Sequence, residues 1–306
     1  MPLTRALINR HGGNRNDTYG AALLDVAQDH LLWHLDSNGH FADASLVFKG
    51  GTSLRKCRIG TLGRFSTDLD FNAQDDDTVL AVCESIHEAR VGGFHFTLGS
   101  ASDDGRHWAL DIVHEELGRP DITASVEFAR RPLALPPQRL RCEALAIHRD
   151  YGFALPILPV IALEEACAEK LARWRRTALQ RDCYDLAWYA EQILDESLIR
   201  RLWVLKVWGD VVQDERGSKP LDPAVITTRR LPKDFQPDSM GKLTHPVELG
   251  RWEQAIRTRS SSSPNSTPTS NTGHGATPAT LTQYKARLRH SKTLNAERLM
   301  RLPPHL

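Results

Sequence analysis

The first clear pattern along the chain is a helical one, over residues 18–39. Apolar side chains recur there about three or four residues apart, which puts them on one face of a helix. Asp17 or Thr18 can cap the start of this helix, and Gly39 follows its end. We expect its inner face to carry Leu23, Val26, Ala27, Leu31 and Leu35.

Two short strands and a second helix follow this segment. Residues 45–48 form an apolar run that stops at Gly50 and Gly51, and residues 68–71 alternate between polar and apolar side chains. Strict alternation predicts a strand with one buried face. The acidic residues 75–77 can cap a helix that reaches about residue 90.

Three more strand patterns lie near residues 93–98, 107–114 and 121–128. The last is the clearest, because Ala124, Val126 and Phe128 alternate with polar residues.

Beyond Pro159 the hydrophobic period becomes helical, with segments near 162–178, 180–192 and 195–208. A first half that mixes strands and helices, followed by helices alone, predicts an α+β fold.

The C-terminal end has a different composition. Residues 260–282 are almost entirely Ser, Thr, Pro, Asn and Gly, which cannot bury enough apolar surface to offset the entropy of ordering. We expect a core over 1–158, a helical lobe over 159–259, and a disordered tail over 260–306 that is Ser/Thr/Pro-rich and then basic. Residues 132–159 match no pattern that we can assign.

Composition adds limits to this picture. Hydrophobic residues make up 41% and charged residues 25%, which is typical of a globular protein. No apolar run approaches the roughly 20 residues that span a bilayer, and the N-terminus has no signal-peptide pattern. We therefore expect a cytoplasmic protein that does not bind membranes. Its five scattered cysteines lack a Cys-x-x-Cys pair, so we expect them to be reduced and mostly buried.

Charge is spread unevenly along the chain. Residues 251–306 hold nine Lys/Arg and two Asp/Glu, so the first 250 residues carry 30 basic and 36 acidic side chains. An acidic body fits a site that needs carboxylates. The basic end could contact nucleic acid, or it could be a solvated tail without function.

The first candidate for chemistry is the turn after the strand at 45–48. A strand that runs into Gly50 and Gly51 lets backbone N–H groups approach a phosphate closely. A helix that begins there would add the partial positive charge of its N-terminus. Two glycines alone are equally compatible with an ordinary loop.

The second candidate is the pair Asp68 and Asp70. Side chains two apart on a strand face the same way, so the two carboxylates converge while Leu69 and Phe71 enter the core. Paired carboxylates repel one another and suit Mg²⁺ or Mn²⁺. The alternative is a solvated acidic turn, since the aspartates at 75–77 lie just beyond.

A third carboxylate would complete a site for two metal ions. Glu127 is the better candidate, because it lies on the polar face of the strand pattern at 121–128. Asp111 is the alternative. Taken alone, either residue is more often an ordinary surface residue.

The helix over 162–178 carries a lysine beside its apolar stripe. Lys170 either extends out to solvent or points into a cleft toward an anion. Farther along, Arg181 and Asp185 are spaced i,i+4 and could form a surface ion pair. Without further context, this segment is typical of an ordinary helix surface.

Taken together, these motifs resemble the AbiEii/AbiGii toxin family of nucleotidyltransferases, from type IV toxin–antitoxin and phage-defence systems. Four blocks appear in the family's order: residues 48–55, residues 64–71 with the sequence Arg-Phe-Ser-Thr-Asp-Leu-Asp-Phe, residues 126–132, and residues 165–186. The resemblance covers about residues 20–255. The stretch after Arg259 departs from the family.

The resemblance implies a polymerase-β-like nucleotidyltransferase core, with a mixed sheet and flanking helices, and a second lobe that closes over the nucleotide. It implies transfer of a nucleoside monophosphate from an NTP to an acceptor, with release of pyrophosphate. The catalytic residues would be Asp68, Asp70, Glu127, Lys170 and Asp185, of which the first three would bind the metal. The nucleotide-binding residues would be Lys49, Gly50, Gly51, Thr52, Ser53, Arg64, Ser66, Arg181 and Asp182.

The family also implies partners. These are an NTP, an RNA acceptor with the 3′ end of tRNA foremost, and a cognate antitoxin encoded nearby. Two alternatives stay open on the residues alone. The same core could label a hydroxyl side chain of a protein, or a degenerate core could bind only a nucleotide or an antitoxin.

Overall fold

The computed structural model describes residues 2–129, 131–176 and 179–210, together with residues 254 and 258. The tail expected over 260–306 lies outside the described residues, as does most of the end of the expected helical lobe. The division of the chain at residues 158 and 259 therefore stays a prediction.

Eight strands of the described chain form one mixed sheet, in the order β3-β4-β5-β6-β2-β1-β8-β7. They are β1 (Leu46–Lys49), β2 (Asp68–Ala73), β3 (Ala89–Val91), β4 (Phe94–Ala101), β5 (His107–His114), β6 (Ala124–Ala129), β7 (Gln138–Arg141) and β8 (Ile157–Val160). The β2–β6 and β1–β8 pairs are parallel, and the other neighbouring pairs are antiparallel.

The helices are α1 (Arg5–His11), α2 (Tyr19–Ser37), α3 (Gly50–Leu54), α4 (Asp76–Ile86), α5 (Leu163–Arg176), α6 (Gln180–Ala190) and α7 (Glu196–Trp208). A π-helix, Arg55–Ile59, continues α3 without a break. Short 3-10 helices lie at Asn16–Thr18, Gly60–Leu62 and Ala146–Asp150.

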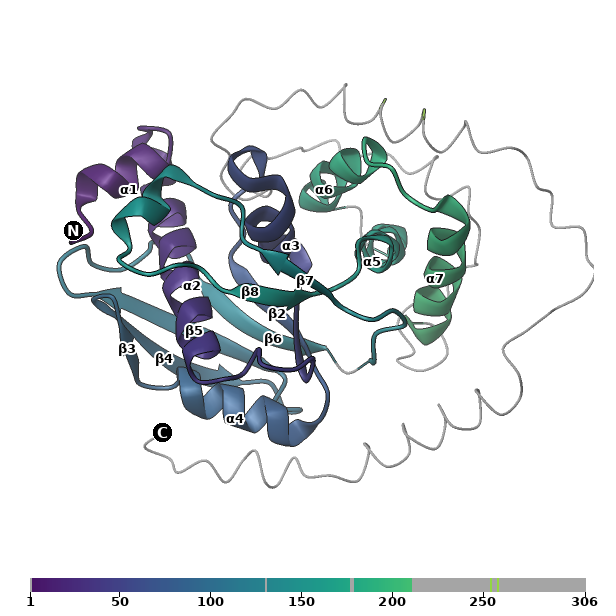
Figure 1. Cartoon of the computed structure of the whole chain (residues 1–306), viewed down its shortest axis with the longest axis horizontal. Coiled ribbons are helices and arrows are strands. Elements are labelled where there is room, and N and C mark those ends of the chain that lie inside the picture. Colours follow the sequence, from purple (N-terminus) through teal and green to yellow (C-terminus); the bar gives the residue numbers. More distant parts are fainter. Residues whose placement is uncertain (1, 130, 177–178, 211–253, 255–257, 259–306) are drawn as a thin grey trace, which may run out of the picture.

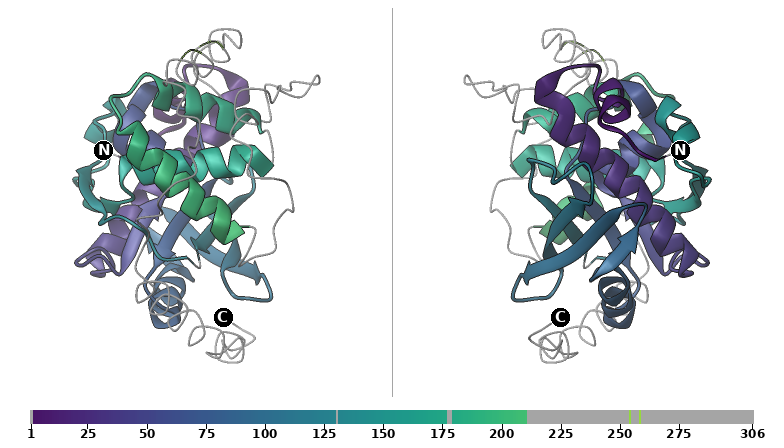
Figure 2. Two further views of the ribbon diagram at one scale, coloured as in Figure 1. Left: turned by 90° about the vertical axis from the view of Figure 1, so that its right-hand side faces the viewer. Right: turned by 90° about the vertical axis from the view of Figure 1, so that its left-hand side faces the viewer.

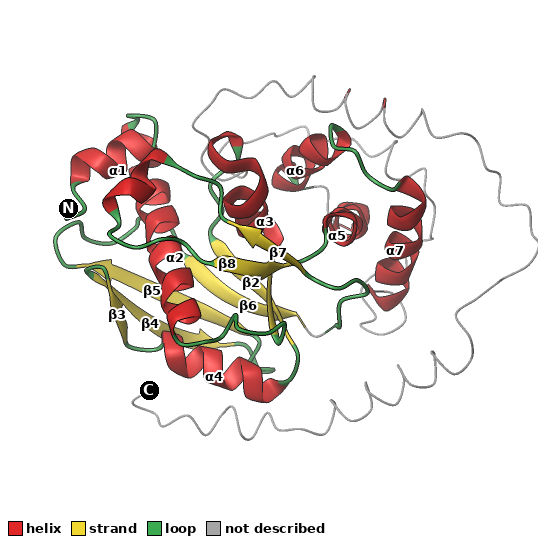
Figure 3. Ribbon diagram, in the orientation of Figure 1, coloured by secondary structure: helices red, strands yellow, loops and turns green. Residues whose placement is uncertain are grey.

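The helices fall into two groups around the sheet. α2 and α4 lie over one face, whereas α5, α6 and α7 gather on the side away from β3 and β4 (Figures 1 and 3). A view from that side has α5, α6 and α7 in front of the strands (Figure 2).

Apolar side chains form two main clusters that match these groups. The larger one includes Phe48 and Phe71 of the sheet together with Leu31 of α2. The smaller one joins α5, α6 and α7 through side chains such as Tyr189 and Trp203. The cavity described below is lined by residues of the sheet and of these three helices.

The α+β fold expected from the sequence is confirmed, and so are most of its elements. The expected helix over 18–39 is α2, and the three helical segments beyond Pro159 are α5, α6 and α7. Asp75 caps α4, as expected, by accepting a hydrogen bond from the Thr78 amide at 2.8 Å. The helix ends at Ile86 and not near residue 90, because the chain turns there into β3.

Two further observations concern the cysteines and the hydrophobicity of the helices. All five cysteines are buried and none of them forms a disulfide, as we expect of reduced structural cysteines. Within the described ranges, no helix is long and apolar enough to cross a membrane.

Candidate active site

Three carboxylates lie side by side across β2 and β6. In the parallel ladder, Asp70 is the partner of Glu127 and Asp68 is the partner of Ser125. The Ser125 hydroxyl donates to Asp68 Oδ1 at 2.9 Å, and His107 Nδ1 lies 3.2 Å from Glu127 Oε1. All three carboxylates line one cavity. The structure thus brings together the three residues that the sequence suggests as metal ligands.

Asp111, the alternative third carboxylate, lies elsewhere. It is on β5, half exposed, and pairs with Arg119 at 2.5 Å. It does not line the cavity. Glu127 is therefore the carboxylate that accompanies Asp70.

Asp70 has an unfavourable electrostatic environment. Burial and then the negative charge of Glu127, with a smaller effect of Asp68, raise the pKa of Asp70 to about 7, although Lys49 and Lys170 oppose this shift. Neighbouring carboxylates that cannot all ionise at low cost are typical of sites that bind a cation.

The donor set fits a hard divalent cation. Within the described part of the chain, no three His, Cys, Asp or Glu side chains already converge as a metal site. Even so, three carboxylates on adjacent strands supply the oxygen ligands that Mg²⁺ and Mn²⁺ prefer. A cation between them would also relieve the repulsion that raises the pKa of Asp70.

Both glycines of the turn allow close approach. Gly50 has φ +77°, and a Cβ there would overlap the carboxylate of Asp70. A Cβ on Gly51 would overlap the guanidinium of Arg64 and would come close to the Ser66 hydroxyl. Because neither glycine carries a side chain, Asp70, Arg64 and Ser66 can all lie against the turn, and all five residues line the cavity.

The two hydroxyl residues after the turn lie behind it. Thr52 Oγ1 donates to the Asp68 carbonyl oxygen at 2.5 Å, and Ser53 Oγ donates to the Gly50 carbonyl oxygen at 3.0 Å. Both side chains are buried, and neither residue lines the cavity. Both hydroxyls donate hydrogen bonds within the protein, so the geometry does not favour the contact with phosphate that we expect of them from the sequence.

A buried network positions Lys170 at the cavity. Its ammonium pairs with Asp185 at 2.7 Å and with Asp182 at 3.2 Å. Asp185 in turn accepts two hydrogen bonds from Arg64, at 3.0 and 2.9 Å. Lys170 and Arg64 line the cavity, whereas the two aspartates are buried behind them. Asp182 and Asp185 therefore hold the cations and do not themselves reach a ligand.

Arg181 also lines the cavity, close to other cations. Burial, followed by the charges of Arg173 and Arg64, lowers the pKa of its guanidinium. Among the described residues it makes no hydrogen bond and no ion pair. A guanidinium held among like charges favours a bound anion.

A second ionic network, which the sequence did not suggest, joins β1 to the helical lobe. Glu169 of α5 accepts from Lys49 at 2.6 Å and from Lys206 of α7 at 2.9 Å. Burial would raise the pKa of Glu169, but these two ammonium groups hold it at about 2. Glu165 binds Lys206 at 2.5 Å as well. The only signal in the sequence was the spacing of Glu165 and Glu169, four residues apart on one helix face.

The cavity has a volume of about 680 Å³. Its wall also contains Arg106 and His107, at the start of β5, and Arg131, which follows β6. Arg131 lies in the block at 126–132 that carries part of the family resemblance. The sequence did not single out Arg106 or His107, because strand alternation does not reveal which residues of a hairpin meet a distant helix.

The chain is similar to known proteins in sequence and in fold. The model of the AbiEii nucleotidyl transferase toxin family, a type IV toxin–antitoxin system, matches residues 33–274. MenT4, a nucleotidyltransferase toxin from Mycobacterium tuberculosis, is 61% identical in sequence to this chain, with a TM-score of 0.81. The match covers 84% of this chain and 88% of the MenT4 chain. JHP933 from Helicobacter pylori is 17% identical in sequence to this chain, with a TM-score of 0.45. The match covers 79% of this chain and 90% of the JHP933 chain. No curated protein matches the chain.

The family carries general implications for substrate and partner. A type IV toxin of this kind implies an NTP substrate and an antitoxin partner, and nucleotidyltransferases of the family generally use divalent metal ions. The chain belongs to the AbiEii family and is a nucleotidyltransferase toxin of the type IV toxin–antitoxin class.

Proposed function

We propose that this toxin transfers a nucleoside monophosphate from an NTP to the 3′ end of an RNA, with tRNA as the acceptor. The observation that carries the proposal is that both carboxylates and cations line one cavity. Asp70 and Glu127 belong to the carboxylates, here called the acidic part, and Arg64, Lys170 and Arg181 belong to the cations, here called the basic part. A metal-bound triphosphate needs both.

The basic part would bind the triphosphate. The backbone of Gly50 and Gly51 has no side chain to exclude a phosphate, and backbone N–H groups of such a turn bind phosphate oxygens. Lys170 and Arg181 would neutralise the phosphate charge, and this interaction would strengthen as charge moves onto the pyrophosphate. Asp185 supports this role because it orients Lys170.

The acidic part would hold the reacting centre. The acceptor oxygen would form a bond to the α-phosphorus, the bond to the bridging oxygen would break, and pyrophosphate would leave. Asp68, Asp70 and Glu127 would hold Mg²⁺ or Mn²⁺, which would neutralise the triphosphate and lower the pKa of the acceptor hydroxyl.

The acceptor would approach from the side of β5. The side chains of Glu127 and His107, which both line the cavity, are 43% and 54% exposed. The cavity is therefore open to solvent at Glu127. The family resemblance supports tRNA as the acceptor, a cytoplasmic site of action and a cognate antitoxin encoded nearby.

The test is incubation of the purified toxin with each α-labelled NTP, total RNA and total protein, followed by separation of the two fractions. Label in tRNA that is lost when the RNA 3′ ends are first oxidised with periodate supports the proposal. Label in the protein fraction instead would show a protein-modifying nucleotidyltransferase and would overturn it.

A further inference from the structure

Three polar side chains of α2 form a buried row. Gln28 and Asp29 follow Asp25 by three and four residues, which places both of them beside Asp25 on one side of the helix. Their exposed fractions are 0%, 1% and 1%. Charged groups are buried at high cost unless they are paired, so Asp25 and Asp29 need partners.

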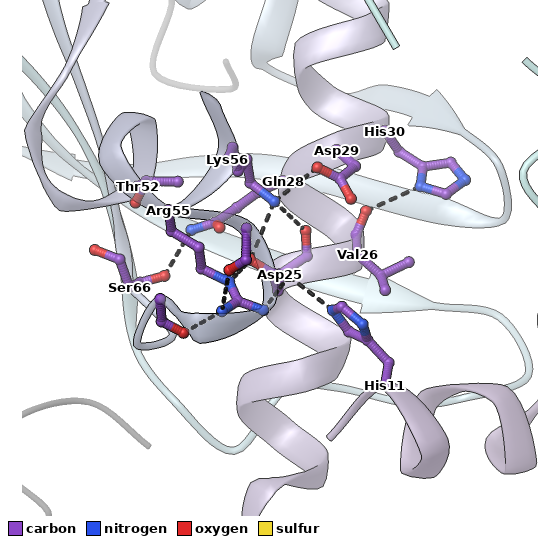
Figure 4. Close-up of polar contacts among 12 residues, drawn as sticks. His11, Asp25, Val26, Gln28, Asp29, His30, Thr52, Arg55, Lys56 and Ser66 are labelled. Carbon is purple, nitrogen blue, oxygen red and sulfur yellow. Dashed lines mark hydrogen bonds and ion pairs between the residues drawn. The ribbon is translucent and has the colours of Figure 1, made fainter. Parts of the chain in front are cut away.

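Asp25 binds the two basic residues that directly follow α3 (Figure 4). Its carboxylate accepts from Arg55 Nε at 3.0 Å and from Arg55 Nη2 at 3.2 Å. Lys56 Nζ donates to the Asp25 carbonyl oxygen at 2.8 Å and to its carboxylate at 3.1 Å. His11 Nε2 lies 2.7 Å from the same carboxylate.

Asp29 holds the same lysine from the next turn of α2. Lys56 Nζ donates to Asp29 Oδ1 at 2.7 Å, and the Tyr151 hydroxyl donates to Asp29 Oδ2 at 2.7 Å. Lys56 is thus bound by both carboxylates, one helical turn apart.

Gln28 lies between the two aspartates and contacts a different segment. Its Nε2 donates to the Ser66 carbonyl oxygen at 3.0 Å and to the Thr67 carbonyl oxygen at 3.1 Å. These carbonyls directly precede Asp68, the first residue of β2.

The partners of this row flank the two motifs of the active site. The chain leaves the sheet at Gly50, passes through the π-helix at Arg55–Ile59, and returns to the sheet at Asp68. Arg55 also donates to the Gly63 carbonyl oxygen, and its guanidinium lies 4.1 Å from the centre of the Phe65 ring. One helix therefore binds both parts of this excursion, and none of its residues lines the cavity.

We propose that Asp25, Gln28 and Asp29 are positioning residues for nucleotidyl transfer. The two aspartates fix the Gly50–Gly51 turn through Arg55 and Lys56, and Gln28 fixes the strand that carries Asp68 and Asp70. This inference rests on the proposed function of the turn and the carboxylates.

The chemistry of the row favours positioning over stabilisation. Buried ion pairs often give no more stability than apolar residues of the same size, so their net gain is geometric. Hydrogen bonds of this kind behind a metal site typically change metal affinity or activity about 10–100-fold when they are lost. The two kinds of contact are also separate in the structure. The aspartates bind Arg55 and Lys56 after the turn, whereas Gln28 binds the backbone just before β2.

Gln28→Met tests the contact with the strand, because it keeps the length of the side chain and removes only the two hydrogen bonds. The matched control is His34→Met, which removes a hydrogen bond of 2.9 Å from α2 to the Ser85 carbonyl oxygen, far from the cavity. We expect Gln28→Met to weaken Mn²⁺ binding at least about tenfold in calorimetric titration. His34→Met should lower the melting temperature to a similar extent and leave Mn²⁺ affinity unchanged.

Asp29→Asn tests the contact with the turn, and leaves Lys56 paired with Asp25. We expect it to weaken binding of inorganic tripolyphosphate about tenfold and to leave Mn²⁺ affinity unchanged, the reverse of Gln28→Met. The inference is overturned if Gln28→Met and Asp29→Asn bind Mn²⁺ and tripolyphosphate as tightly as the wild type does. It is also overturned if His34→Met loses as much affinity as they do, or if the wild type binds neither Mn²⁺ nor tripolyphosphate. Failure to label RNA, with these differences intact, would contradict only the proposed function.

Discussion

At the scale of single residues, Lys170 has two buried aspartates behind it and the cavity in front of it. Lys170→Ala should lower the transfer rate about 10²–10³-fold, because a cation that neutralises developing charge is lost. Asp182 and Asp185 keep Arg173 and Arg64 as partners, so the protein should stay folded. Transfer and melting temperature are measured on the same sample.

Lys170→Met is the control for this substitution, since it keeps the apolar stem and loses only the charge. It should be as inactive as Lys170→Ala. Near-normal turnover of both variants, with reduced stability, would make Lys170 a packing residue.

Gly50 is the second residue with a sharp expectation. Gly50→Ala should remove activity, because the methyl group would push the Asp70 carboxylate away and φ +77° disfavours alanine. The conformational part alone costs about 1–2 kcal/mol of stability. Gly39→Ala is the control, because its φ is +81° but its Cβ would meet nothing. Equal activity of both variants would contradict the role of the turn.

Local sequence patterns predicted some site residues and missed others for a clear reason. Asp68 and Asp70 could be paired from their spacing on one strand. Asp25 could not be paired with Arg55, because 30 residues separate them and neither carries a local sign of its partner. For the same reason, the sequence did not reveal that the Thr52 hydroxyl donates a hydrogen bond to the Asp68 carbonyl oxygen.

At the scale of elements, α5 connects the sheet to the helical lobe through Glu169. The pKa of Glu169, about 2, lies below the ordinary value of about 4.3 that is expected in the unfolded chain. The stability that this carboxylate contributes is therefore present above about pH 4 and is lost as the pH falls toward 2. The contribution is on the order of 2–3 kcal/mol.

Glu169→Gln should therefore flatten the dependence of unfolding free energy on pH between about pH 5 and 2. Denaturant unfolding at a series of pH values measures this. The exposed Glu191→Gln should behave like the wild type. An unchanged slope in Glu169→Gln would show that the Lys49–Glu169–Lys206 network does not contribute to acid stability.

Several elements that the sequence failed to predict are short. β7 and β8 have four residues each, too few for a period to develop; β7 lies within the stretch 132–159, and β8 ends one residue beyond it. β8 pairs with β7 and with β1, and β1 lies more than a hundred residues earlier. Long amphipathic helices such as α5 were predictable because their period repeats several times.

At the scale of the whole molecule, carboxylates of the sheet and cations of the helical lobe line one cavity. Mn²⁺ or Mg²⁺ should raise the melting temperature, because a ligand that binds only the folded state stabilises it. Asp70→Asn should abolish this increase and, without metal, should be at least as stable as the wild type, since it removes repulsion from Glu127. A metal-dependent increase that survives in Asp70→Asn would contradict the assigned ligands.

The most direct test of the account is transfer of an α-labelled NTP to tRNA by the wild type, Asp70→Asn and Lys170→Ala under identical conditions. We predict label at the tRNA 3′ end with the wild type, dependent on Mg²⁺ or Mn²⁺, and none above background with either variant. Label that appears equally with all three proteins would contradict the assignment of this cavity as the site of nucleotidyl transfer.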